Sequence, residues 1–158
     1  MFEKIKHAHK KNKYLLIKKA IILESFKLDF DFDMMFSLFS KYNNLEHSRK
    51  KEFLGQIIRM NNIPIFKPFL DYMMSNLKDV FKMGQLDFFY SLRGDVGIAH
   101  EDGENVIIIG IKNVTYYHVD NIDLQVNPGD LLFIPKKMLH HSFSSRERII
   151  LSFSVWNK

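Results

Sequence analysis

The sequence predicts a mainly β fold with helices in its N-terminal half, and three observations lead to this class. After Leu86, eight short strand-like runs follow one another with only turn residues between them. No helical period interrupts these runs, whereas residues 33–83 contain three stretches with helical spacing. Short strands at regular spacing are typical of an antiparallel sandwich or barrel, and eight strands is the number in a jelly roll.

The chain has 158 residues, enough for one domain with its own core and too few for two comfortable ones. Its 46% hydrophobic and 26% charged residues are ordinary for a globular protein. The texture of the sequence changes near residue 86. We therefore divide the chain into an N-terminal strand and helical segment (1–85), packed on the barrel, and a jelly-roll core (86–158).

The N-terminal half contains one predicted strand and three predicted helices. "YLLIKKAII" at 14–22 is rich in branched apolar residues, which favours a strand. Residues 33–43, 46–60 and 69–83 show helical spacing, and prolines in 61–68 mark a connector. The helix predicted at 69–83 has one apolar face, made of Leu70, Met73, Met74, Leu77 and Phe81.

The C-terminal half contains the eight predicted strands. Their ranges are 88–92, 96–100, 105–111, 114–119, 123–126, 131–135, 140–144 and 148–156. Because side chains alternate between the two faces of a strand, only one of His140 and His141 can point into a barrel.

Composition excludes several classes of function. The chain has no cysteine, so it has no disulfide, thiolate ligand or cysteine nucleophile. Lys18 and Lys19 interrupt the apolar part of the N-terminus, and no apolar run reaches the roughly 18 residues of a membrane span. The net charge is +5, but no aromatic-interleaved basic motif accompanies the lysines, which disfavours nucleic-acid binding. We expect a cytoplasmic protein without a membrane span.

The turn "GDVGIAHEDGEN" contains a candidate pair of metal ligands, His100 and Asp102. An i, i+2 pair at the end of a strand can converge on one ion, and a distant histidine would complete a 2-His-1-carboxylate site for Fe(II). The pair alone is weak evidence, because chance gives about one such His-x-acid pair in this composition. A second pair, His118 and Asp120, does occur, and Glu104 is a rival carboxylate.

The stretch "NPGDLLFIPKKMLHHSF" supplies the distant histidine and decides between the pairs. With its two motifs the sequence resembles the cupin superfamily. The first motif, glycine, five residues and His-x-acid, is matched by Gly94, His100 and Asp102. The second, glycine, five residues and Pro-x-Gly-x-x-His, is matched by Gly129, Pro135 and His140, with Lys137 at the usual glycine.

Further motifs are similar to the JmjC-type branch, which includes the asparaginyl hydroxylase of hypoxia-inducible factor. They are Asn105, the strand "VIIIG", Gly110-Ile-Lys112, "GDLLFIP", His140-His141 and "ILSFSVW". The resemblance covers residues 86–157 and implies a double-stranded β-helix, or cupin barrel. It also implies an Fe(II)- and 2-oxoglutarate-dependent oxygenase whose substrate is a small molecule or a protein side chain. Among such oxygenases, a hydroxylase is the expected type.

The resemblance also assigns roles to individual residues. His100, Asp102 and His140 would hold Fe(II), and Lys112 would bind the far carboxylate of 2-oxoglutarate. Thr115 and Tyr116, on the next strand, would complete the hydrogen bonds of that carboxylate.

The chain departs from the JmjC pattern in three places. The strand before Lys112 is about two residues shorter than usual, the loop between strands 114–119 and 123–126 lacks a long insert, and Met138-Leu139 replaces an aromatic pair. Two other functions therefore stay open: a non-redox cupin that binds a small molecule such as a sugar, and a cupin isomerase or epimerase. A homodimer is also possible, because apolar helices such as the one predicted at 69–83 often pair between two copies of a chain.

The remaining histidines and arginines have simpler expected roles. We expect a strand end and a turn cap at His118 and Asp120, and an outer-face position for His141. Surface positions in contact with solvent are expected for His7, His9, Arg146 and Arg148. For the two arginines cosubstrate binding stays open, since an arginine near a distal histidine binds cosubstrate in other oxygenases.

Overall fold

The computed structural model describes residues 1–29, 31, 33–34, 37, 41, 45–47, 55–59, 64–96 and 98–158. The elements in chain order are α1 (Phe2–Lys10), β1 (Leu15–Ile17), the 3₁₀ turn η1 (Leu23–Phe26), β2 (Leu45–His47), β3 (Gly55–Arg59), the 3₁₀ turn η2 (Pro64–Phe66), α3 (Lys67–Leu77), β4 (Phe81–Val96), β5 (Asn105–Lys112), β6 (Thr115–Val119), β7 (Ile122–Val126), β8 (Leu131–Ile134) and β9 (His140–Asn157).

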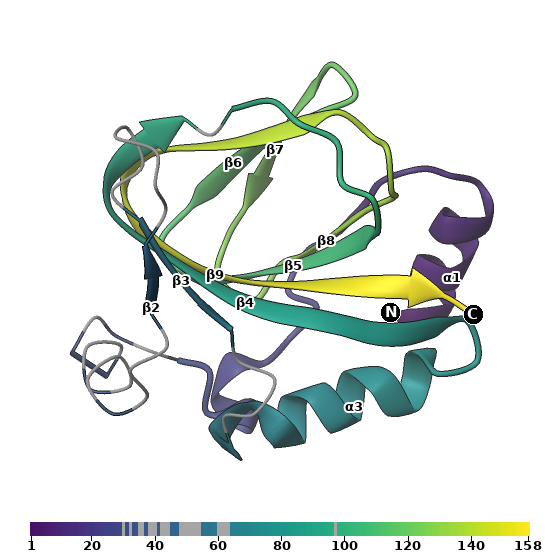
Figure 1. The fold of residues 1–158 in the computed structure, drawn as a ribbon, viewed down its shortest axis with the longest axis horizontal. Helices are drawn as coiled ribbons and strands as arrows, with labels where there is room; N and C mark the ends of the chain where they lie inside the picture. Colours follow the sequence, from purple (N-terminus) through teal and green to yellow (C-terminus); the bar gives the residue numbers. More distant parts are fainter. Residues whose placement is uncertain are drawn as a thin grey trace.

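Two long strands, β4 and β9, join the two sides of the barrel. The sheet has the order β1-β8-β5-β9-β4-β3-β2, and β6 and β7 attach through β9. The C-terminal half of β9 pairs with β5 and its N-terminal residues pair with β6, while β4 follows it from Phe81↔Asn157 to Val96↔Phe143. Figure 1 shows both strands running above α3 and then curving round to the opposite side of the barrel. The two strands predicted at 140–144 and 148–156 are therefore the two ends of one strand.

Strand β5 is buried on both faces and separates two apolar clusters. Ile107 and Ile109 pack in the larger cluster, together with residues of α1 and α3. Val106 and Ile108 point the other way, into a smaller cluster inside the barrel that includes Tyr117 of β6. This double burial explains why the run "VIIIGI" shows no alternation of apolar and polar residues. The prediction of a mainly β fold with a jelly-roll barrel is confirmed.

Helix α3 is shorter than the predicted helix at 69–83. It begins at Lys67, with Pro68 in the first turn, where a missing N–H costs nothing. Leu70, Met73 and Leu77 are buried as predicted. The helix ends at Leu77, and Phe81 is the first residue of β4, so its side chain is buried from a strand.

Two other predicted elements are wrong in the structure. The helix predicted at 46–60 is replaced by β2 and β3, because Ile57 and Ile58 pair with Phe89 and Phe88 of β4 and extend the sheet. The strand predicted at 14–22 is limited to β1, since Lys19 has a left-handed backbone (φ 48°) that ends the strand. The helix predicted at 33–43 lies largely outside the described residues, and the division at residue 85 stays a prediction.

Among the helices that the structure describes, none is long and apolar enough to cross a membrane. A cytoplasmic location stays a prediction.

Asp130 fastens β1 to the barrel. Its carboxylate accepts hydrogen bonds from the backbone N–H groups of Lys19 (2.8 Å) and Asn127 (2.9 Å), and from the Lys18 ammonium (3.0 Å). Burial alone would raise the pKa of Asp130, but these donors together hold it below its ordinary value. The charged carboxylate is therefore part of the folded structure.

We expect Asp130→Asn to lower the free energy of unfolding by about 2–3 kcal/mol, because an amide cannot replace both acceptor oxygens in this buried position. Urea denaturation measures the change, and Asp71→Asn, at an exposed ion pair with Lys67, is the control expected to change little. Since the folded pKa of Asp130 is lowered, its contribution to stability is lost as the pH falls below about 3.8. Equal effects at Asp71 and Asp130 would contradict this account.

Candidate metal centre

Backbone pairing brings the two halves of the candidate site together. His100 follows β4 in a loop, and His140 is the first residue of β9. The two residues form an isolated antiparallel bridge, in which His100 N–H donates to the His140 carbonyl (2.9 Å) and His140 N–H donates back (3.0 Å). Ligands 40 positions apart in the sequence thus become neighbours.

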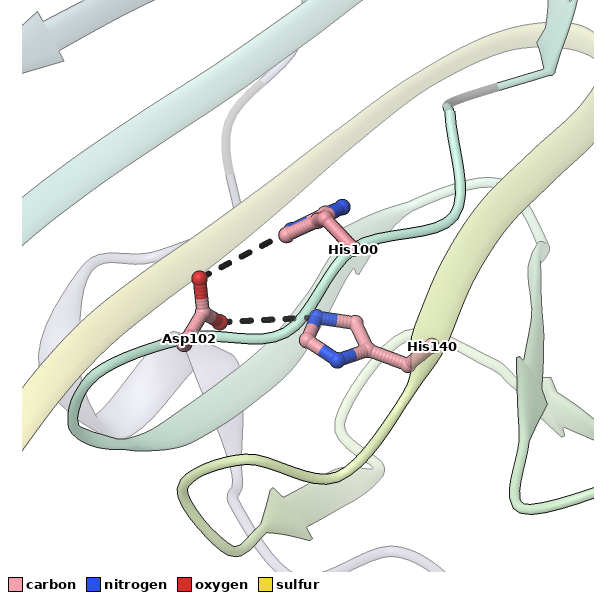
Figure 2. A group of neighbouring side chains, drawn as sticks. All are labelled: His100, Asp102 and His140. Carbon is pink, nitrogen blue, oxygen red and sulfur yellow. Dashed lines mark ion pairs between the residues drawn. The ribbon is translucent and has the colours of Figure 1, made fainter.

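Asp102 faces both imidazole rings from one side, as Figure 2 shows. One carboxylate oxygen is 3.7 Å from His100 Nε2, and the other is 3.5 Å from His140 Nε2. One ligand atom from each of the three residues lies within 4.8 Å of the others. Within the described part of the chain, this is the one group of three or more such side chains that close together.

Both imidazoles are oriented with Nε2 toward the centre. His100 Nδ1 lies 2.8 Å from the Ile98 carbonyl, and His140 Nδ1 lies 2.9 Å from the Met138 carbonyl. A carbonyl only accepts, so each Nδ1 carries the proton and each Nε2 keeps a free lone pair. Burial lowers the pKa of His140, which favours the neutral ring that a metal ion requires.

The donor set fits a divalent transition metal. Two neutral imidazoles and one carboxylate are the ligands of the facial triad that binds Fe(II) and leaves coordination positions open. The side chain of His140 is 6% exposed and that of His100 is 55% exposed, so the centre opens to solvent on the His100 side. Glu104, the rival carboxylate, lies outside the cluster.

Lys137 supports Asp102 through its backbone. Its N–H donates to the Asp102 carbonyl (2.8 Å), and its φ of 60° is left-handed. This conformation explains why the cupin motif usually has glycine at this position, since only glycine adopts it without strain. The departure from the motif therefore preserves the backbone geometry.

We expect Lys137→Gly to leave metal affinity unchanged, because glycine keeps both the N–H and the left-handed backbone. Relief of strain is expected to raise the free energy of unfolding by up to about 1 kcal/mol. Urea denaturation and calorimetric metal titration measure the two quantities. A loss of metal binding in this variant would show that the lysine side chain itself supports the site.

Thr115 is buried inside the barrel with an unsatisfied hydroxyl. It is fully buried, and its Oγ1 has no hydrogen-bond partner among the described residues. Thr115 shares the inner face of β6 with Tyr117 and Val119, which belong to the inner apolar cluster. A buried hydroxyl without a partner is rare, and a bound polar ligand would satisfy it.

The structure separates Tyr116 from Thr115. Tyr116 points to the outer face of β6, where its ring stacks on Phe143 at 5.2 Å between centres. Because side chains alternate along the strand, Tyr117 rather than Tyr116 shares the inner face with Thr115. The prediction that Tyr116 lines the same pocket as Thr115 is therefore corrected.

Lys112 ends β5 and is half-buried without an ion-pair partner among the described residues. The pairing of β5 with β9 shifts register between Gly110 and Lys112, directly after the segment 105–110 that is shorter than the JmjC pattern. A glycine is required at position 110, because a Cβ there would collide with the Asn127 carbonyl. The backbone of Gly110 is also hydrogen-bonded to the turn before β8: its N–H donates to the Asp130 carbonyl, and its carbonyl accepts from the Gly129 N–H.

Arg148 is buried, contrary to expectation. Its side chain donates to Ser142 Oγ (3.2 Å), two residues along β9 from His140, and only 3% of Arg148 is exposed. The sequence "SSRER" resembles a solvated turn, so polarity alone was misleading. Alternation from the inward-facing Ile150 would have placed Arg148 on the inner face. Arg146 is exposed as expected.

His9 is also not a free surface residue. Helix α1 places its ring against Phe81 (4.7 Å between centres) and Phe133 (6.4 Å). Burial lowers the pKa of His9, a hydrogen bond with Asn105 opposes the shift, and the charge of Lys136 adds to it.

We expect His9 to make stability fall as the pH decreases from neutral. The pKa of His9 is lowered in the folded state, so the unfolded chain binds more protons below about pH 6.5 and the free energy of unfolding drops there. Urea denaturation of the parent and of His9→Phe at pH 7.5 and 5.5 tests this. The variant is expected to lose less stability between the two pH values, and His7→Ala is expected to behave like the parent.

The fold is a mainly β barrel, a double-stranded β-helix, and it is shared with solved structures. No protein-family model matches the chain, and no curated protein matches it. The likeness to solved structures is therefore one of fold.

Three solved structures illustrate the likeness. The ribosomal oxygenase YcfD of Escherichia coli, in complex with cobalt and 2-oxoglutarate, has a TM-score of 0.72 at 15% identity over 99% of this chain and 51% of YcfD. A prolyl-4-hydroxylase of Pseudomonas putida has a TM-score of 0.75 at 10% identity over 100% of both chains. The epimerase SnoN from nogalamycin biosynthesis has a TM-score of 0.72 at 8% identity, covering 98% of this chain and 82% of SnoN. The chain spans about half the length of YcfD.

Proposed function

We propose that this protein is an Fe(II)- and 2-oxoglutarate-dependent oxygenase that hydroxylates a substrate. One observation carries the proposal: in a barrel with the fold of such enzymes, two imidazole Nε2 atoms and the Asp102 carboxylate converge within 4.8 Å. Both Nδ1 atoms are engaged by carbonyl oxygens, so the rings are already oriented for a metal ion. This arrangement is the one that Fe(II) oxygenases require.

The residues for the cosubstrate lie on the two strands that follow the first ligand pair. We place the far carboxylate of 2-oxoglutarate between Lys112, which has no described ion-pair partner, and the unsatisfied hydroxyl of Thr115. A charged ammonium group offsets the desolvation of a carboxylate, and a hydroxyl supplies a second donor. The burial of Thr115 supports a ligand inside the barrel.

In the proposed reaction the protein holds the metal ion and its cosubstrate and excludes bulk water from them. His100, Asp102 and His140 would hold the ion, and a triad of this kind leaves coordination positions open. The inner cluster around Ile108 and Tyr117 keeps bulk water from the closed side of the site. When bound, Fe(II) supplies the activation of oxygen with 2-oxoglutarate as the electron donor.

The substrate class stays open between a small molecule and a protein side chain. The solvent-exposed His100 places the open side of the centre at the protein surface, where either could approach. The likeness to SnoN, an α-ketoglutarate-dependent epimerase, favours epimerisation on the same site as the second candidate. A non-redox cupin that binds a small molecule is the third.

The test is an anaerobic titration of the purified protein with Fe(II) and then 2-oxoglutarate. We expect a visible metal-to-cosubstrate charge-transfer band in the parent protein and in His7→Ala, whose histidine is exposed on α1. His100→Ala is expected to lose the band. Metal binding without a band would contradict the cosubstrate site and favour the non-redox cupin.

If the band forms, oxygen is admitted and succinate is measured. Slow succinate release without added substrate is expected of an oxygenase or of an oxidative epimerase. Product analysis on candidate substrates then separates the two, because a hydroxylase adds one oxygen atom and an epimerase leaves the product mass unchanged.

A further inference from the structure

A second pair of histidines lies on the outer face of the barrel. His118 of β6 and His141 of β9 are direct partners in the register of the two strands. Their rings stack with centres 5.2 Å apart and planes inclined by 27°. Alternation along β9 puts His141 on the opposite face from His140, so this pair is separate from the candidate metal centre.

The ring of His118 is oriented by a carboxylate. Its Nδ1 lies 2.7 Å from an oxygen of Asp123, its partner on β7. The carboxylate only accepts, so the Nδ1 proton points to Asp123 and Nε2 keeps a free lone pair. A histidine that binds a metal through one nitrogen commonly donates its other N–H to a carboxylate in this way. The side chain of His118 is 37% exposed and that of Asp123 is 72% exposed, so solvent reaches the pair.

We propose that His118 and His141 form a second metal site, which takes a late divalent transition metal such as Ni(II), Cu(II) or Zn(II). Each metal–nitrogen bond is about 2.0–2.1 Å long, so nitrogens that share an ion lie within about 4 Å of each other. Rings with centres 5.2 Å apart reach this separation after a modest rotation of the solvent-accessible side chains. Water completes the coordination.

The ligand set distinguishes this site from the inner one. Two imidazoles without a directly bound carboxylate favour Ni(II), Cu(II) and Zn(II) over Fe(II) and Mg(II). The neighbouring pair Tyr116 and Phe143 also stacks, at 15°, but it offers no ring nitrogen. Ring stacking alone does not require a carboxylate at His118, so the contact with Asp123 favours a metal-binding role for the histidine pair. An ion here would link β6 to β9 directly.

The experiment uses the full chain with the inner site removed by the double substitution His100→Ala and Asp102→Ala. We expect calorimetry to find one equivalent of Ni(II) bound to this variant, and a Ni(II)-dependent rise in its melting temperature. Adding His118→Ala or His141→Ala is expected to abolish both signals. Adding Asp123→Asn should weaken Ni(II) binding about 10-fold through loss of the carboxylate partner, and adding His7→Ala should change nothing.

Two results would overturn this proposal: no Ni(II) binding by the double variant, or binding that survives the loss of both His118 and His141. Unchanged affinity in Asp123→Asn would overturn the role of the carboxylate. The charge-transfer band with Fe(II) and 2-oxoglutarate depends on the inner site alone. It is expected to persist in His118→Ala, so failure of either proposal is recognisable without the other.

Discussion

Asp102→Ala is expected to weaken Fe(II) binding by more than about 100-fold and to abolish the charge-transfer band. Loss of a group that merely supports a ligand costs 10–100-fold in metal affinity, and loss of a ligand itself costs more. Asp102 is the one carboxylate in the described cluster, and it faces both Nε2 atoms at 3.5–3.7 Å. Calorimetric titration with Fe(II) under anaerobic conditions, or with Co(II) as an air-stable substitute, measures the effect.

Glu104→Ala is the matched control for this prediction. Glu104 is two positions further along the same turn, carries the same charge and is half-buried. We expect its removal to change metal affinity less than about 3-fold, the size of a small long-range charge effect. If Glu104→Ala removed metal binding and Asp102→Ala did not, the assignment of the carboxylate ligand would be wrong.

Lys112→Ala is expected to raise the dissociation constant of 2-oxoglutarate by about 10- to 100-fold while leaving metal affinity unchanged. A charge-assisted hydrogen bond contributes about 1.5–3 kcal/mol, which corresponds to that range. Thr115→Val removes only the hydroxyl of a neutral donor, so we expect a smaller effect of about 3- to 10-fold. Titration of the charge-transfer band with 2-oxoglutarate gives both constants.

Two controls make this prediction specific. Lys136→Ala removes an exposed lysine of the loop near Asn105, and Tyr116→Phe removes a hydroxyl from the outer face of β6. Neither should alter the dissociation constant of 2-oxoglutarate. A normal constant in Lys112→Ala would mean that the register shift after Gly110 carries the ammonium away from the cosubstrate.

The strands of the barrel could be predicted because their pattern is local. The run before Gly110 shows its burial directly in the sequence, because it is apolar on both faces. The strands within 46–60 could not be predicted, because β3 forms through pairing with β4 and β2 through pairing with β3. Helical spacing within the segment gives no sign of these partners. The same reason applies to His9, whose burial depends on rings of β4 and β8.

The candidate metal centre could be predicted as a set of residues but not as a geometry. Two motifs selected His100 and His140 from seven histidines, and the structure places them in one backbone bridge. The sequence could not show that their Nδ1 atoms bond to Ile98 and Met138, since carbonyl groups leave no mark on residue type. The choice between Tyr116 and Tyr117 also depended on the phase of one strand, where a shift by one residue exchanges the faces.

The course of β9 has a consequence for how the protein opens. This strand hydrogen-bonds to β4, β5 and β6, and its first residue is His140. Detaching the N-terminal end of β9 from β6 therefore opens the barrel and separates His140 from His100 in the same event. Amide protons of β5 and β9 are expected to exchange with solvent together, by global unfolding, and a bound ion should slow both equally. The metal centre therefore exists only when the barrel is closed, and a chain with an open barrel cannot bind the metal ion there.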